Sequence, residues 1–270
     1  MNISGCRWTD LPLSFDHLTN LRQLRSLVAR ECGLLAEHCA SLGRLTGLET
    51  LELSANPGLR GFRQLSGLAQ LTSLGLVSVP AGDFSFLSRL SRLQRLALAP
   101  LPGKADEDRV AQLRNGLLHV SVAAASQLTA LHLVGCPVDE GCLERMGALT
   151  ALRRLGLTDC YWEDPGTAAA AAAGGQGQGP AGQQAGQQAR QHHGTAGAGG
   201  GGHEGHGAPD RTQRSRIDPS SLVALLRRLP RLDTLLLEST AVGEGWQQLA
   251  AEQLPGPTVL QVVGVPQPQP

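Results

Sequence analysis

The sequence predicts an α/β solenoid, with a curved, parallel β-sheet on the concave face and short helices or 3-10 turns on the convex face. The first observation is a phrase with leucine at fixed spacing, LxxLxxLxLxxN, which residues 45–56 match throughout. The second is its recurrence, in copies that begin at Leu21, Leu45, Leu68, Leu90, Ala125, Leu149 and Leu229, and in a weaker copy at Leu254. The third is that Leu51 and Leu53 alternate with other residues, which is the period of a strand with one buried face.

The recurring phrase resembles the repeat of the leucine-rich repeat family, with cysteine in place of the last asparagine in some copies. The resemblance implies that each copy supplies one strand and stacks on the next copy, because no copy can bury its leucines alone. Each leucine that becomes fully buried contributes roughly 1.5–3 kcal/mol. The predicted core therefore runs without interruption along the stack.

The last position of the phrase turns the chain away from the sheet. We expect Asn56 to bond backbone groups of the turn through its amide, and a cysteine thiol offers a weaker donor at the same place. The copies with cysteine carry Cys32, Cys136 and Cys160. Three other copies carry Val79, Leu101 and Thr240. For these three turns we expect packing or backbone contacts instead.

The segments between the strands are expected to form the convex layer. Residues 36–45 and residues 83–90 are interpreted as short helices. Residues 57–68 carry Leu59, Phe62 and Leu65 at every third position. This spacing predicts a tight or 3-10-like return.

Three further helices are predicted from their first turns. Acidic residues at 106–108 precede apolar residues spaced for one helical face, at Val110, Leu113 and Leu117. Gly116 weakens this long helix, and an extended conformation of residues 117–120 stays open as an alternative. Asp139 is the predicted N-cap of a helix over residues 140–146. Asp218 caps another helix, which has proline at its first position.

The repeats fall into two blocks. Residues 1–165 form the first block of the predicted solenoid, and residues 217–265 form a C-terminal block. Between them, residues 166–216 are rich in Gly, Ala, Gln and His and have almost nothing to bury, which predicts a disordered insertion. The insertion is expected to leave from the return side, without breaking the sheet. Residues 266–270 are expected to form a disordered tail.

Composition narrows the function classes. The formal net charge of zero, from 23 basic and 23 acidic residues, argues against a nucleic-acid partner and against a membrane partner. We interpret the six cysteines as reduced, structural thiols. No apolar run reaches the length of a signal peptide or the ~20 residues of a membrane helix, so a cytoplasmic protein is expected. Ile3 and Cys6 fall at repeat positions, which favours a natural start upstream of Met1.

Motifs for catalysis, cofactors or metals are weak. Residues 197–202 match GxGxxG, but they follow no predicted strand and open no predicted helix. Residues 203–206 are one residue short of the HExxH zinc motif. The arginines of the basic run at 211–216 are interpreted as a solvated flank, with docking of an acidic partner as the alternative. We therefore predict no enzyme activity, no cofactor and no metal site.

The candidate site is the outward face of the strands. The predicted outward positions are Arg25 and Val28, Glu49 and Glu52, Thr72 and Gly75, Gln94 and Ala97, Thr129 and His132, Arg153 and Gly156, and Asp233 and Leu236. The candidate partner-binding residues, from consecutive repeats, are Arg95, His132, Arg153 and Arg154. Small residues nearby, Ala97 and Gly156, leave room for the side chains of a partner.

The predicted function is a non-catalytic protein–protein interaction scaffold, which binds a protein partner on its concave face. The family resemblance suggests a cytoskeletal or axonemal assembly as its setting in the cytoplasm. The first alternative is a substrate-recognition subunit of a ubiquitin ligase, because cysteine-containing repeats resemble those of F-box proteins. No F-box is seen ahead of these repeats, which counts against this alternative. A GTPase regulator is a weaker alternative, since no arginine here can be matched to a catalytic one.

Overall fold

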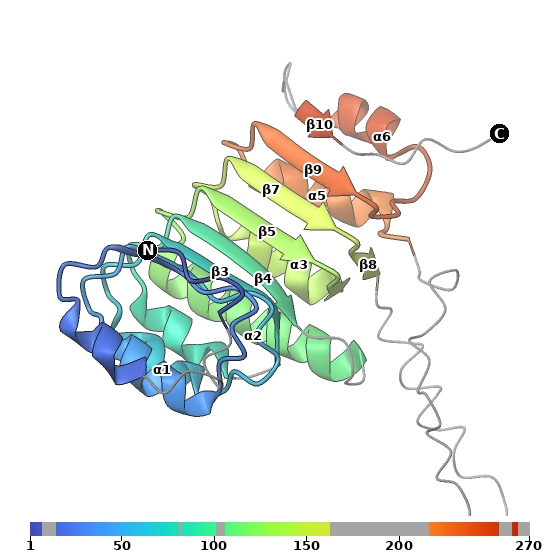
Figure 1. Cartoon of the computed structure of the whole chain (residues 1–270). Helices are drawn as coiled ribbons and strands as arrows, with labels where there is room; N and C mark the ends of the chain where they lie inside the picture. The colour runs from blue at the N-terminus through green and yellow to red at the C-terminus, as the bar shows by residue number, and fades with distance from the viewer. Residues whose placement is uncertain (7–14, 81–82, 101–105, 163–215, 254–260, 264–270) are drawn as a thin grey trace, which may run out of the picture.

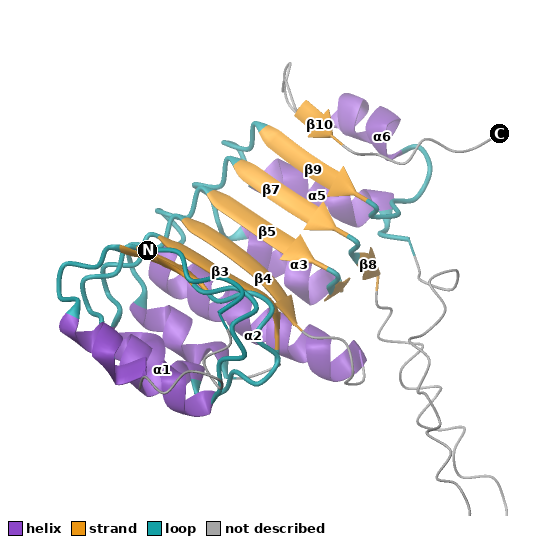
Figure 2. Ribbon diagram, viewed as in Figure 1, coloured by secondary structure: helices purple, strands orange, loops and turns teal. Residues whose placement is uncertain are grey.

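The computed structural model describes residues 1–6, 15–80, 83–100, 106–162, 216–253 and 261–263. They build a solenoid in which strands lie side by side in one parallel sheet and helices cover one of its faces (Figure 1). Figure 2 shows the strand layer and the helix layer as separate colours. We call the helix-free face of the sheet the concave face. The predicted leucine-rich repeat solenoid is confirmed.

Eight strands within the described ranges form the main sheet, each paired in parallel with the next. In sheet order, they are β1 (Ser26–Val28), β2 (Thr50–Glu52), β3 (Ser73–Val79), β4 (Arg95–Pro100), β5 (Ala130–Val134), β7 (Arg154–Thr158), β9 (Thr234–Glu238) and β10 (Gln261–Val263). The pairing places one leucine of each copy in register, namely Leu27, Leu51, Leu74, Leu96, Leu131, Leu155 and Leu235. The phrase therefore sets the register of the sheet from β1 to β9.

The last strand departs from the predicted alignment. The leucine spacing aligns Leu260 with Leu235, whereas the structure pairs Val262 with Leu235. The last copy is therefore shifted by two residues relative to the leucine spacing. The last copy also has Pro257 where the other copies have their second leucine or an equivalent apolar residue, so the spacing anchors it poorly.

The alternation along the strands agrees with the predicted phase. Leu51 is 1% exposed and Leu53 is fully buried, whereas Thr50 and Glu52 between them are half-buried. The buried leucines of successive copies join in one core that extends from Leu18 to the helix after β9. The stack is thus held together by the side chains that the phrase repeats.

Asn56 holds its turn as predicted, and it reaches into the preceding copy. Its side-chain oxygen accepts hydrogen bonds from the backbone N–H groups of Cys32 and Leu34, at 3.0 and 3.1 Å. Its side-chain nitrogen donates to the carbonyls of Ala29 and Leu53, at 2.8 and 2.7 Å. Asn56 is fully buried, so backbone groups of two copies depend on one amide.

Thr240 corrects one expectation about the turns. Its hydroxyl donates to the carbonyl of Leu157 at 2.7 Å and accepts from the backbone N–H of Cys160 at 3.1 Å. A side-chain bond, rather than packing alone, therefore holds this turn. Cys160 itself lies 3.5 Å from the carbonyl of Leu133, in agreement with a weak thiol donor. Leu101 lies outside the described residues.

The residue before the turn position adopts a left-handed backbone in copy after copy. The φ angles are 54° at Glu31, 58° at Ala55, 55° at Ser78, 53° at Asp159 and 52° at Ser239. Gly135 occupies the same position with φ of 59°. A left-handed conformation costs roughly 1–2 kcal/mol for a residue with a side chain, so the turn bonds must offset this strain in each copy. The sequence pattern did not predict this feature.

The convex layer contains both α-helices and 3-10 helices. Helix α1 (Ala36–Gly43) confirms the first predicted helix, and η3 (Phe62–Gly67) confirms the 3-10-like return. The segment predicted as a helix at 83–90 is instead the 3-10 helix η4 (Phe84–Arg89). The tighter turn places Phe84 and Leu87 at i and i+3, where both are buried. The 3-10 helix η2 (Phe15–Asn20) was not predicted.

Helix α2 (Asp106–Ala124) resolves the alternative left open for residues 117–120, which are helical. Gly116 lies against the ring of Phe84 in η4, and a β-carbon at Gly116 would come within 3.4 Å of that ring. The glycine weakens the helix locally, but it lets the neighbouring return pack closely. Arg114 of α2 also forms an ion pair with Asp139 of the next copy.

The two predicted N-caps are confirmed. Asp139 accepts a hydrogen bond from Cys142 N–H at the start of α3 (Glu140–Gly147). Asp218 accepts one from Ser221 N–H at the start of α5 (Pro219–Arg228). Helix α6 (Trp246–Gln253) follows β9 and completes the described part of the convex layer.

The sheet is continuous across the long insertion. Strand β7 pairs directly with β9, from Arg154 opposite Thr234 to Thr158 opposite Glu238. Beside the main sheet, β6 (Pro137–Val138) and β8 (Tyr161–Trp162) form a short parallel ladder after the turns. Residues 163–215 lie outside the described residues, so the disorder predicted for the insertion stays a prediction. The two predicted repeat blocks therefore contribute strands to one sheet.

Candidate partner-binding face

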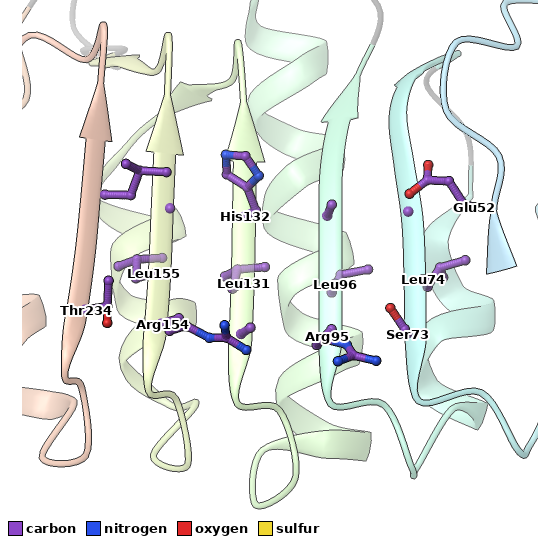
Figure 3. A pocket seen from close by; sticks show the side chains of 15 residues that line it. Glu52, Ser73, Leu74, Arg95, Leu96, Leu131, His132, Arg154, Leu155 and Thr234 are labelled. Carbon is purple, nitrogen blue, oxygen red and sulfur yellow. The ribbon is translucent and has the colours of Figure 1, made fainter. Parts of the chain in front are cut away.

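A hollow of about 350 Å³ lies on the concave face, across strands β3, β4, β5, β7 and β9 (Figure 3). Two rows of side chains line it. The first row contains Ser73, Arg95, Ala130, Arg154 and Thr234. The second row contains Gly75, Ala97, His132, Gly156 and Leu236. The rows follow from the register, because each of these residues flanks a buried leucine on its own strand.

The start of each strand is set by a shared backbone acceptor. The carbonyl of Gln94 accepts from the N–H groups of both Thr129 and Ala130, at 2.8 and 3.0 Å. The carbonyl of Thr129 accepts in the same way from Arg153 and Arg154, at 2.9 Å each. In each pair, one N–H belongs to the residue that begins the strand and lines the hollow, Ala130 or Arg154. The other N–H belongs to the preceding residue, Thr129 or Arg153, which lies at the edge of the sheet.

This geometry moves the first predicted outward column by one residue. The column that faces the hollow is Ser73, Arg95, Ala130, Arg154 and Thr234 rather than Thr72, Gln94, Thr129, Arg153 and Asp233. Three of the four candidate residues, Arg95, His132 and Arg154, line the hollow. Arg153 precedes β7, does not line the hollow, and lies 3.9 Å from the carboxylate of Asp233. The structure therefore brings three of the four candidate residues together at the hollow, and Arg153 lies at the edge of the hollow.

Arg95 and Arg154 differ from other arginines of this face in their surroundings. Arg25 lies 3.8 Å from Glu49, Arg30 lies 3.2 Å from Glu52, and Arg153 is paired with Asp233. Within the described part of the chain, no hydrogen bond or ion pair involves the guanidinium of Arg95 or Arg154. Figure 3 shows Arg154 leaning toward β5 and Arg95 leaning toward β3. Both side chains are exposed to solvent at the hollow.

His132 is held in place from the neighbouring strand. Its Nε2 lies 2.9 Å from the hydroxyl of Thr158, and its ring covers Gly156, where a β-carbon would approach Cδ2 to 2.6 Å. Burial lowers the pKa of His132 below its ordinary value of 6.5, while the negative charge of Glu238 opposes this shift. His132 is therefore largely neutral at pH 7 and acts as a hydrogen-bonding, aromatic wall of the hollow.

Glu52 forms the opposite end of the hollow. Its side chain is only 18% exposed and lies over Gly75, whose absent side chain makes room for the carboxylate. The carboxylate pairs with Arg30, and it accepts hydrogen bonds from the hydroxyl and the N–H group of Ser54. The sequence places Glu52 in solvent, whereas the structure binds it to its neighbours. Its charge is thus already compensated at the rim.

A second groove, of about 570 Å³, lies on the convex side between α3 and α5. Glu140 and Glu144 of α3 face Ser221 and Arg228 of α5 across it. The apolar pattern of the sequence does not reveal this groove, because it is formed by helices from copies that flank the insertion. Its mixed charges do not favour a ligand of either sign.

The described residues contain no group of three or more His, Cys, Asp or Glu side chains that could hold a metal ion. The short histidine motif at 203–206 lies outside them. Over the same residues, no helix is both long and apolar enough to cross a membrane. None of the six cysteines, all within the described residues, forms a disulfide; Cys6 is exposed and the other five are buried.

No protein-family model matches the chain, and no curated protein matches its sequence. Among solved structures, an internalin (inlF) from Listeria monocytogenes is similar over 94% of this chain and 58% of that chain, with a TM-score of 0.51 and 14% identity. The Arabidopsis receptor kinase HAESA ectodomain, in complex with an N-terminally extended IDA peptide hormone ligand, is similar over 54% of this chain and 24% of that chain. Its TM-score is 0.35 and its sequence identity is 20%. The chain thus spans little more than half of the internalin chain, and that likeness supports the leucine-rich repeat fold.

Proposed function

We propose that the protein is a non-catalytic scaffold that binds a partner protein on its concave face. The observation that carries the proposal is the hollow across β3 to β9, whose floor is a hydrogen-bonded sheet rather than a loop. Such a floor loses little conformational freedom when a partner binds, so little of the interaction energy is spent on ordering it. Arg95, His132 and Arg154 supply charge and hydrogen bonds, and Arg153 extends the contact at the edge.

The small residues of the second row make this face accessible. Ala97 and Gly156 leave the backbones of β4 and β7 within reach of a partner's side chains, while Leu236 offers a half-buried apolar contact. A mixture of apolar and charged contacts is typical of protein interfaces. For the setting, we propose a cytoskeletal or axonemal assembly in the cytoplasm, on the analogy of the fold.

A ubiquitin-ligase substrate receptor is the second candidate. It is favoured by the buried cysteines Cys136 and Cys160 at the turn positions, which resemble the cysteine-containing repeats of F-box proteins. In both candidates the concave face is the surface that binds a protein. The two differ in whether ubiquitin-ligase subunits are recovered together with the chain.

The test is affinity capture from native extract with a variant that fills the hollow. Ala97→Trp places a large ring over β4, whereas Val122→Trp on α2, where Val122 is 77% exposed, is the matched control on the convex side. Both variants should keep the thermal transition of the wild type. The proposal expects Ala97→Trp alone to lose the specifically captured proteins. Loss with Val122→Trp, and retention with Ala97→Trp, would move the contact to the convex side.

A further inference from the structure

We propose that the hollow binds an acidic segment of the partner protein, with carboxylates held by Arg95 and Arg154. This inference rests on the proposed function and adds the chemistry of the occupant. The arginines of the concave face differ in whether a carboxylate lies beside them. Neighbouring arginines of the concave face have carboxylates within 3.2–3.9 Å, but neither Arg95 nor Arg154 has such a neighbour among the described residues.

The two arginines belong to one row, with the small residue Ala130 between them. The register places Arg95 opposite Ala130, and Ala130 opposite Arg154. Their α-carbons are therefore two strand spacings apart, or about 9.6 Å. Arg154 leans toward β5, where the small residue Ala130 is its neighbour in the row, and Arg95 leans toward β3 (Figure 3). Because Ala130 is small, it leaves the exposed guanidinium groups of the row accessible to acidic side chains.

The charges that line the hollow also favour an acidic occupant over a basic one. Glu52, the carboxylate that lines the hollow, is already bound by Arg30 and Ser54. His132 carries little charge near pH 7, since burial lowers its pKa. The two uncompensated charges that line the hollow are therefore both positive. An arginine binds a carboxylate through two parallel N–H groups, which makes such bonds stronger than those between neutral groups.

The second row adds an apolar requirement. Ala97 and Leu236 lie beside the arginine row, one residue-pair further along the strands. An occupant that fits both rows presents carboxylates to Arg95 and Arg154 and an apolar side chain to Ala97. Single-stranded nucleic acid fits this surface less well. It binds through stacking on aromatic side chains, and His132 is the one aromatic ring among the residues that line the hollow.

The experiment titrates the full chain with fluorescein-labelled dodecapeptides and follows fluorescence anisotropy. One peptide alternates glutamate with leucine and alanine, and its counterparts carry glutamine or lysine in place of glutamate. A single-stranded oligonucleotide is the fourth probe. The glutamate peptide should bind most tightly, and its affinity should fall when the salt rises from about 0.05 to about 0.15 M, because partly exposed ion pairs are screened. Failure of the glutamate peptide to bind at millimolar concentration overturns the inference.

Arginine variants test whether the glutamate peptide binds to the row that contains Arg95 and Arg154. Arg95→Gln and Arg154→Gln should each weaken the glutamate peptide about tenfold, the effect of losing one charge-assisted hydrogen-bond pair. Arg25→Gln removes the same charge from an arginine that lies outside the hollow and is paired with Glu49, and it should change the affinity less than about twofold. Equal weakening by all three variants means diffuse attraction, and it overturns the inference, as does tighter binding of the glutamine peptide or the oligonucleotide.

Partner capture separates this inference from the proposed function. If Ala97→Trp abolishes capture while the double variant Arg95→Gln/Arg154→Gln retains it, the concave face binds the partner but the acidic occupant is wrong. If neither variant affects capture, both proposals are wrong. Loss of capture in both variants, with wild-type circular dichroism and thermal transition, supports both.

Discussion

Replacing Asn56 with alanine should cost far more stability than any other change at a turn position. The amide accepts from two backbone N–H groups, at Cys32 and Leu34, and donates to backbone carbonyls of both copies. Asn56 is fully buried, so water cannot replace these bonds. A buried group left unsatisfied costs about 1–3 kcal/mol, so the two N–H groups alone predict a loss of about 2–6 kcal/mol in the free energy of unfolding.

Cys136→Ala is the matched control, because Cys136 occupies the same position in another copy. Its thiol lies 3.4 Å from the carbonyl of Val134 and accepts no backbone N–H in the described structure. Its loss should cost about 1 kcal/mol, the scale of deleting a small buried group. Urea unfolding followed by circular dichroism measures both variants. Hydrogen exchange at Cys32 and Leu34 adds a local probe, because repeat arrays can lose two-state behaviour. A loss for Asn56→Ala no larger than for Cys136→Ala, with both amides still protected, would refute the reasoning.

Three further changes probe other parts of the structure. Leu51→Ala should cost about 2–5 kcal/mol in free energy of unfolding, whereas Glu52→Ala should cost about 1 kcal/mol for its bonds to Arg30 and Ser54; equal losses in urea unfolding would contradict the strand phase. The exposed thiol of Cys6 should react rapidly with a disulfide reagent in the native protein, and the five buried thiols should react slowly. Burial also raises the pKa of Cys39 and of Cys142 to about 12, which disfavours their reactive thiolate form. Rapid reaction of several thiols would contradict the buried positions. His132 has a folded pKa below its unfolded value of 6.5, so the unfolded chain takes up its proton first as pH falls. Stability from the neutral ring is present above pH 6.5 and is lost as pH falls toward the lowered pKa. In His132→Gln, this part of the pH dependence of unfolding should disappear, and an unchanged profile would exclude His132 as its source.

The register of the sheet could be predicted because the phrase repeats one buried leucine per strand. Leu51 and its counterparts pair across the sheet in the order that the spacing indicates. The prediction was wrong at β10, where the last copy carries Pro257 and offers few leucines to align. Apolar spacing therefore predicts register only where the apolar positions are occupied.

The candidate site could be predicted in part. The alternation correctly predicts His132 on the concave face, but it predicts the first outward column one residue early, at Arg153 rather than Arg154. The start of each strand depends on a backbone carbonyl shared by two N–H groups, which leaves no mark in the apolar pattern. The absence of a carboxylate beside Arg95 depends on the residues in the same row of the two neighbouring strands. These residues are Ser73 and Ala130, and they can be identified only once the register is known.

The contacts that hold the turns could also be predicted only in part. The hydrogen bonds of Asn56 follow from its chemistry and its place in the phrase. Thr240 was expected to rely on packing or backbone contacts, but its hydroxyl both donates and accepts at the turn. A hydroxyl can substitute for part of the amide when the neighbouring carbonyl and N–H lie on the correct side, and that depends on three-dimensional position.

The central claim, that the concave hollow is the surface that contacts a protein partner, is tested most directly by site-specific photo-cross-linking. A benzophenone amino acid at position 97, in the floor of the hollow, is compared with the same amino acid at position 122, on the exposed side of α2. In native extract, position 97 should form discrete adducts that an excess of unlabelled wild-type chain abolishes, and position 122 should not. Competed adducts from position 122 alone would contradict the claim and place the contact on the helical face.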